Sequence, residues 1–198
     1  MNVNRQWVLA KRPHGMVTRD NFEYREVPIP EPGDGEVLIR NLYLSFDPTQ
    51  RGWMEDVESY LPPVQLGEVM RAGSVGQVVE TRSPDFEKGD LVQTTGGWQD
   101  FLVSSPGMGA LGLNKLTENV SPVMALGALG VTGITAYWGL LDLGQPKQGE
   151  TVLVSGAAGA TGSVAGQIAR IKGCRVVGIA GGREKCRWLK EVARFDEV

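Results

Sequence analysis

The second half of the chain alternates between two patterns of apolar positions. Continuous apolar runs predict strands of a parallel sheet that is covered on both faces, and a stretch with helical spacing follows each run. In the first helical stretch, Val164, Ile168 and Ile171 are spaced i, i+4 and i+7 and form one apolar face. The predicted strands and helices lie, in chain order, at 151–155, 159–172, 175–180 and 183–193. This order predicts the first part of a doubly wound parallel sheet.

The first half of the chain has shorter apolar runs, which Gly and Pro separate. Runs of strand length lie at 37–46, 73–80, 91–94 and 98–104. Such closely spaced short strands predict a small β-barrel or a β-sandwich. A helical stretch then begins at Pro122, which follows the candidate N-cap Ser121, and runs to about Leu143 with a possible break at its glycines.

The scarce residue types exclude several kinds of site. The sequence has one histidine, His14, and two cysteines, Cys174 and Cys186. These residues cannot form a His-rich or a four-Cys zinc site, and a Ser-His triad could use only His14. We therefore expect no metal site. The two cysteines make a poor disulfide framework, so we expect a reducing, cytoplasmic compartment.

Charge and hydropathy argue against nucleic-acid and membrane partners. The formal net charge is −3, so no general attraction to nucleic acid is expected. Two uncharged stretches, 119–141 and 151–169, are long enough to span a bilayer. Both are rich in Gly, Ala, Ser and Thr rather than in large apolar residues. We therefore expect neither a nucleic-acid partner nor a membrane segment.

The segment 155–162 carries the most informative motif. It follows a predicted strand and begins a predicted helix, and it matches the pattern GxGxxG except that Ala157 replaces the first glycine. Gly159 would let the backbone approach a diphosphate, and Gly162 and Gly166 would let the helix pack closely on the strand. The free amides and the positive end of the helix would then face the anion. The alternative is a tight turn of small residues that holds no ligand.

The end of the second predicted strand favours one dinucleotide over another. A site for NAD usually has an Asp or Glu at this place, which bonds to the ribose 2′-hydroxyl. This chain has Gly181 and Gly182 there, and the cations Arg183 and Lys185 follow. The two cations would attract a 2′-phosphate, so we expect NADP(H) as the cofactor. The alternative is a solvated helix face on which Glu184 pairs with a neighbouring cation.

Several segments together resemble the zinc-independent branch of the medium-chain dehydrogenase/reductase superfamily. The segment 45–52 is similar to the S-x-D-P-Y-M-R-G motif of its alkenal/one double-bond reductases, which include prostaglandin and curcumin reductases. Further matching segments lie at 87–92, 97–100, 133–141, 144–147 and 153–186. The resemblance covers nearly the whole chain.

This resemblance implies an α/β plus β architecture. A GroES-like β-barrel domain would occupy residues 1–128, and the first part of a Rossmann domain would occupy residues 129–198. The implied reaction passes a hydride from NADPH to the β-carbon of an α,β-unsaturated ketone or aldehyde, which is a small-molecule substrate. The family pattern also implies a homodimer when the protein is full length.

The same resemblance implies roles for individual cofactor-binding residues. The diphosphate would contact Gly159, Ala160, Thr161 and Gly162, and the 2′-phosphate would contact Lys185. Thr135 would lie near the diphosphate or the nicotinamide ribose. The alternative for Thr135 is a hydroxyl that bonds to the backbone of its own helix.

The substrate side departs from the family pattern. Thr49 stands where the branch usually has a tyrosine that faces the substrate, and Gln50 stands where Met is usual. If that tyrosine polarises the substrate carbonyl, Thr49 is too short to replace it directly, and the remaining candidates are Tyr60 and Tyr43. We prefer Tyr60, which aligns with an aromatic residue of the curcumin reductases; the alternative is that it only packs its loop. Arg51 could hold an anion or form a structural ion pair.

The length of the chain also departs from the family pattern. Family members continue beyond the position of Val198 through further strands and helices. We therefore expect an open apolar edge beside the two predicted strands, and a chain that is unstable alone or pairs this edge with another chain. Two other functions stay open: a non-catalytic NADPH-binding protein, and an inactive fragment that binds neither cofactor nor substrate.

Overall fold

The chain divides into two compact units in the computed structural model, which describes residues 3–107 and 112–198. The N-terminal unit is Met1–Pro122, and the C-terminal unit is Val123–Val198. The division falls a few residues before the domain boundary that the sequence predicts between 128 and 129. The boundary between 128 and 129 stays a prediction, because the family resemblance implies it and a division by compactness does not test it.

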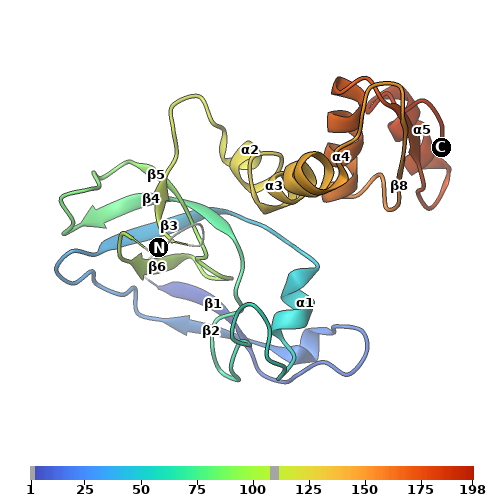
Figure 1. The fold of residues 1–198 in the computed structure, drawn as a ribbon. Helices are drawn as coiled ribbons and strands as arrows, with labels where there is room; N and C mark the ends of the chain where they lie inside the picture. The colour runs from blue at the N-terminus through green and yellow to red at the C-terminus, as the bar shows by residue number, and fades with distance from the viewer. Residues whose placement is uncertain (1–2, 108–111) are drawn as a thin grey trace. The chain divides into compact units, whose positions relative to one another are not determined.

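A five-stranded antiparallel sheet is the main element of the N-terminal unit (Figure 1). Its strand order is β6-β3-β4-β5-β7. The strands are β3 (Val37–Leu44), β4 (Ser74–Thr81), β5 (Leu91–Thr94), β6 (Phe101–Ser104) and β7 (Asn114–Lys115). Val37 and Ile39 on β3 and Val78 on β4 are buried in one cluster with Phe86 and Val92. The spacing of two residues between Val37 and Ile39 is that of a strand with one face on a core.

A two-stranded hairpin, which the sequence pattern did not predict, precedes this sheet. In it, β1 (Asn4–Leu9) pairs antiparallel with β2 (Phe22–Val27), and the short 3-10 turn η1 (Arg19–Asn21) leads into β2. The buried Asn4 side chain accepts a hydrogen bond from the Phe101 amide (2.9 Å) and donates one to the Phe101 carbonyl (2.8 Å).

The β-rich architecture predicted for this unit is confirmed, but the described strands do not close into a barrel. Isolated bridges join β1 to Val69 and Gln99, but they do not continue into a ladder that would close the two sheets on each other. A short helix, α1 (Thr49–Trp53), follows β3. A second buried cluster lies beyond it and consists of Leu9, Met54, Val64 and Met70.

Glycines divide the predicted helical stretch at 122–143 into shorter pieces. These are α2 (Pro122–Leu126), α3 (Val131–Tyr137) and a π-helical turn, η3 (Trp138–Gly144). A Cβ atom at Gly133 would overlap the backbone of Ala128, and one at Gly130 would overlap the Ala125 carbonyl oxygen. The chain can turn from α2 into α3 because these positions carry no side chain. The predicted break at the glycines is confirmed.

A strand, helix, strand, helix order completes the C-terminal unit, as predicted. The elements are β8 (Thr151–Val154), α4 (Ala160–Ile171), β9 (Arg175–Gly178) and α5 (Arg183–Glu191). β8 and β9 pair in parallel, with Val152 opposite Val176. The sequence prediction of the first part of a Rossmann sheet is therefore confirmed.

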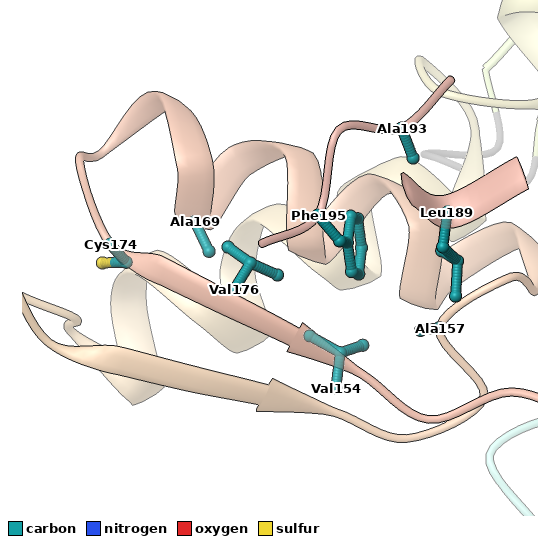
Figure 2. Packing of buried hydrophobic residues seen from close by; sticks show 8 residues of the cluster. All are labelled: Val154, Ala157, Ala169, Cys174, Val176, Leu189, Ala193 and Phe195. Atoms are coloured by element: carbon teal, nitrogen blue, oxygen red, sulfur yellow. The ribbon is translucent and has the colours of Figure 1, made fainter. Parts of the chain in front are cut away.

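The core of this unit lies on one face of the two strands, and Figure 2 shows its side chains. They are Val154, Ala157, Ala169, Cys174, Val176, Leu189, Ala193 and Phe195. The Phe195 ring fills the space left by two glycines: a Cβ atom at Gly166 would overlap the ring, and one at Gly178 would lie 2.8 Å from it. Gly166 therefore makes room for an aromatic side chain, and not for the strand as the sequence suggested.

Of two expectations about the sheet, the open edge is found among the described residues, beside β8 and not β9, and the covering of both faces is corrected. The free edge of β9 is paired, because the Gly178 amide donates to the Glu197 carbonyl (2.8 Å) and Val177 forms a parallel bridge to Glu197. Within the described residues, β8 has no further partner strand, so an open edge lies there instead. The sheet is also not covered on both faces in this chain, since Leu153 is 63% exposed and Ile179 is 55% exposed.

Candidate functional site

The loop between β8 and α4 is held in a tight conformation at the carboxyl end of the sheet. Gly156 has φ +57, a left-handed conformation that glycine adopts without strain. The Gly159 amide donates to the Gly156 carbonyl (2.8 Å), which closes the turn. The Ala157 amide donates to the Ile179 carbonyl (3.0 Å), which ties this loop to the residue after β9. The segments that follow the two strands are therefore neighbours.

The first turn of α4 presents backbone donors that the helix itself does not use. Gly159 is the extended N-cap, and the first helical bond runs from the Ser163 amide to the Gly159 carbonyl (2.9 Å). The amides of Ala160, Thr161 and Gly162 precede this bond, so they have no acceptor one turn earlier in the helix. No side chain caps them. Together with the helix dipole they form a site of positive potential that suits an anion.

Gly162 keeps this turn closed against the loop. A Cβ atom there would overlap the Gly156 carbonyl oxygen and approach Ala157. At Gly159, by contrast, an added Cβ would meet only the Gly156 oxygen, at 3.0 Å. The side of Gly159 away from that oxygen is open, so a ligand could approach the backbone there. Gly162 therefore allows close packing of the helix on the loop, and Gly159 allows a ligand to approach the backbone.

The turn between β9 and α5 places the second set of candidate residues. Gly182 has φ +88 and ends the turn, and α5 begins at Arg183. Gly181, Arg183 and Lys185 are all exposed. In the part of the chain that the structure describes, no ion pair joins Glu184 to either cation. Among the described residues, the structure therefore does not show the alternative in which Glu184 pairs with a neighbouring cation.

These two turns together fit one kind of ligand. β8 and β9 are parallel neighbours, so the loops that follow them lie at the same edge of the sheet. One loop offers unpaired amides for a diphosphate, and the next offers two exposed cations without a carboxylate for a ribose hydroxyl. This donor set fits a dinucleotide that carries a 2′-phosphate.

Thr135 lies on α3, which packs against α4. Its side chain is exposed, and its hydroxyl donates to the carbonyl of Val131 (2.7 Å) in its own helix. The backbone bond that the sequence left as the alternative is therefore present. The hydroxyl oxygen still has capacity to accept a hydrogen bond.

The candidate catalytic residues are side chains of the N-terminal unit. Thr49 is the first residue of α1 and is exposed. Tyr60 is 71% exposed in the loop after α1, and Tyr43 is 46% exposed on β3. Arg51 forms an ion pair with Glu55 (2.8 Å), which is the structural alternative that the sequence allowed.

The N-terminal unit also contains an apolar groove that sequence reasoning missed. Its volume is about 640 Å³, a size typical of small-molecule sites. The Trp98 ring lies between Phe22 (4.9 Å between ring centroids) and Phe46 (5.4 Å). The lining residues are Arg5, Trp7, Arg19, Phe22, Tyr24, Leu44, Phe46, Trp98, Gln99 and Asp100. Thr49 and Tyr60 do not line it, and its residues come from separate segments that share no local pattern.

A charged pair borders this groove. The Arg5 guanidinium donates two hydrogen bonds to the Asp100 carboxylate (2.6 and 2.9 Å). These bonds lower the pKa of the Asp100 carboxyl below its ordinary value and raise that of Arg5. The pair joins β1 to the segment before β6, so it is a structural contact.

Residues 3–107 and 112–198 contain neither a candidate metal site nor a helix that could span a membrane. No group of three or more His, Cys, Asp or Glu side chains in these ranges could hold a metal ion. None of their helices is long and apolar enough to cross a bilayer.

The chain is similar to a known protein family and to several known reductases. The model of a protein family described as the N-terminal domain of oxidoreductase matches residues 5–111. NADPH-dependent curcumin reductase of Escherichia coli (strain K12) is 52% identical over 193 residues, which are 98% of this chain and 55% of the relative. Prostaglandin reductase 1 of Bos taurus is 41% identical over 187 residues, which are 94% of this chain and 55% of the relative.

A solved structure supports the same comparison. The crystal structure of CurA from Vibrio vulnificus in complex with NADPH superposes with a TM-score of 0.90 and 48% sequence identity. The match covers 98% of this chain and 56% of that chain. The chain therefore spans little more than half the length of the relatives it matches.

Proposed function

The chain belongs to the medium-chain dehydrogenase/reductase family, and from this membership we propose that the protein reduces the carbon–carbon double bond of α,β-unsaturated ketones and aldehydes with NADPH. The observation that carries the proposal is the pair of turns after β8 and β9. One presents unpaired amides at 160–162, and the other presents Arg183 and Lys185. The names of the relatives, which include a curcumin reductase and a prostaglandin reductase, support the substrate class.

The cofactor would be held mainly by main-chain groups. The amides of Ala160, Thr161 and Gly162 would donate to the diphosphate, which approaches the open side of Gly159. Arg183 and Lys185 would neutralise the 2′-phosphate, and Gly181 would leave room beside it. Thr135 would lie near the diphosphate or the nicotinamide ribose, where its hydroxyl oxygen would accept a hydrogen bond from a ribose hydroxyl. When bound, the cofactor supplies the hydride that reaches the β-carbon of the substrate.

A hydroxyl group of the N-terminal unit would polarise the substrate. Hydride addition to the β-carbon places negative charge on the carbonyl oxygen, and a preorganised donor stabilises it. A proton from a tyrosine hydroxyl or from water then reaches the α-carbon and gives the saturated carbonyl product. We assign this donor to the Tyr60 hydroxyl, which is exposed and long enough to reach a ligand. Thr49 carries a shorter donor on the rigid start of α1 and would play the lesser part. Tyr43 is the remaining alternative.

A non-catalytic NADPH-binding role is the second candidate function. The observation that favours it is Thr49, which stands where the related reductases usually have a tyrosine. The family pattern also favours a small-molecule substrate and a homodimer in the cytoplasm.

The proposed function is tested by the oxidation of NADPH in the presence of a simple enone, such as methyl vinyl ketone. We expect enone-dependent loss of NADPH absorbance, and formation of the saturated ketone rather than the allylic alcohol. Saturable NADPH binding without turnover would favour the non-catalytic role, and the absence of both would indicate an inactive fragment.

A further inference from the structure

The chain after α1 forms an exposed loop whose two ends meet. We call residues 54–63 the Tyr60 loop. The Val64 amide donates to the Trp53 carbonyl (2.8 Å), which brings together the residues on either side of it. The tip of the loop is exposed, with Val57 at 62% and Tyr60 at 71%. Among the described residues, the Tyr60 side chain forms no hydrogen bond or ion pair, so its position depends on how the ends of the loop are held.

Arg71 holds the C-terminal end of the Tyr60 loop. Its Nη1 donates to the Pro62 carbonyl (2.9 Å). The same guanidinium lies over the Trp53 ring, 5.3 Å from the centroid. Trp53 directly precedes the loop and Pro62 is near its other end, so a single side chain from the segment before β4 joins the two ends. A cation bonded to a carbonyl and stacked on an indole is held more firmly than a neutral donor would be.

Arg12 holds the N-terminal end in a similar way. Its Nη1 donates to the Met54 carbonyl (2.8 Å) and, at 3.3 Å, to the Val64 carbonyl. Its Nη2 forms an ion pair with Asp56 (3.4 Å). The Arg12 side chain is only 22% exposed, so water competes less for its hydrogen bonds. The carbonyls that receive these bonds belong to no helix or strand, so the arginines provide donors that secondary structure does not.

The contacts therefore concentrate at the base of the loop and leave its tip without them. We propose that Arg12 and Arg71 are positioning residues that fix the Tyr60 loop and thereby set the place of the Tyr60 hydroxyl for the carbonyl substrate. The assignment of Tyr60 to the substrate rests on the proposed function. The bracing of the loop by the two arginines does not, because it follows from contacts within the N-terminal unit alone.

The test uses Arg71→Met in the full chain, because methionine keeps apolar contact with Trp53 and removes the donor to Pro62. Loss of this charge-assisted bond should speed amide hydrogen exchange in 54–64 about tenfold. The KM for methyl vinyl ketone should rise by a similar factor, about tenfold, because the donor on the loop is no longer preorganised. The Kd for NADPH should be unchanged.

Two further variants provide the controls. Arg71→Lys keeps a cation over Trp53 and one donor, so it should restore part of the protection and part of the KM. Arg82→Met removes an exposed arginine from a turn elsewhere in this unit and should change neither quantity. A thermal melt of each variant establishes that the comparison is made between folded proteins.

Each outcome decides a separate claim. Unchanged exchange in Arg71→Met would overturn the bracing of the loop. Faster exchange with an unchanged KM would overturn the link between the loop and the substrate. If the wild-type protein reduces no enone, the proposed function fails, and the exchange measurement still decides whether the arginines fix the loop.

Discussion

The two units of this chain place their candidate functional groups by different means. In the C-terminal unit, the groups are main-chain amides at 160–162, which a short contiguous motif sets in place. In the N-terminal unit, they are side chains such as Tyr60, and contacts from distant segments hold the loop that carries them. A site made of backbone is therefore encoded locally, and a site made of side chains on loops is encoded across the chain.

This difference affects how each site responds to substitution. A backbone site tolerates changes of its own side chains but is sensitive to anything that moves the backbone, such as an added Cβ at Gly162. A side-chain site is sensitive both to its own residue and to remote residues that hold its loop. The predictions below begin with the C-terminal unit, first its core and then its backbone site, because the expected effects there are the largest.

Removal of the Phe195 ring should have the largest effect on stability. The ring is 3% exposed and fills the space beside Gly166 and Gly178. Phe195→Ala should lower the free energy of unfolding of the C-terminal unit by about 3–5 kcal/mol, because it leaves a cavity. Chemical denaturation measures the change. Val192→Ala, at a position 62% exposed, is the control and should have an effect under about 0.5 kcal/mol.

A single methyl group at Gly162 should disrupt the anion site. The new Cβ would overlap the Gly156 carbonyl oxygen, so the loop and the helix must separate. Gly162→Ala should cost about 1–3 kcal/mol of stability and weaken NADPH binding in a fluorescence titration. Gly139→Ala is the matched control, since its Cβ would meet nothing within 4 Å. If both variants bind NADPH like the wild type, the close packing of this turn does not matter for the ligand.

Loss of one cation at the start of α5 should alter selectivity rather than stability. Lys185 is exposed, and its side chain forms no ion pair within residues 3–107 and 112–198. Lys185→Gln should weaken NADPH binding about tenfold, the usual value of one charge-assisted bond, and leave NADH binding unchanged. Lys172→Gln is the control, because Lys172 follows the C-terminal end of α4 and the glycine loop precedes the N-terminal end. Equal losses for NADPH and NADH would contradict a role at the 2′-phosphate.

The smallest predicted effect is a pH dependence in the N-terminal unit. Hydrogen bonds from Arg5 lower the pKa of Asp100 in the folded state below its ordinary value of 3.8. The carboxylate therefore contributes stability above that value, and the contribution is lost as the pH falls further, through the folded pKa. Asp100→Asn should flatten this acid limb of the unfolding free energy. The exposed Asp85→Asn is the control and should keep the wild-type slope.

The C-terminal unit could be predicted from the sequence because its signals are local. The runs at 151–155 and 175–180 are apolar and β-branched, and the motif at 155–162 specifies its own turn. One prediction was wrong there, namely that both faces of the sheet are covered, since Leu153 is exposed. A continuous apolar run shows that a strand can be covered, and does not show that the chain contains the covering layer.

The N-terminal unit could be predicted only in part. β3 to β6 follow apolar runs, but β1 begins with the polar Asn4, whose burial is possible only because Phe101 satisfies its side chain across the unit. The sequence left a barrel and a sandwich open, because the isolated bridges that join β1 to Val69 and Gln99 follow no local pattern. The roles of Arg12 and Arg71 are hidden for the same reason, since their acceptors are main-chain carbonyls of a loop, which no side-chain pattern marks.

The central claim is that the turns after β8 and β9 bind a dinucleotide with a 2′-phosphate. Parallel fluorescence titrations of the purified protein with NADPH and with NADH test it most directly. We expect saturable enhancement with NADPH and binding at least about tenfold tighter than that of NADH. Equal affinities for the two nucleotides, or no saturable signal with NADPH, would contradict the claim.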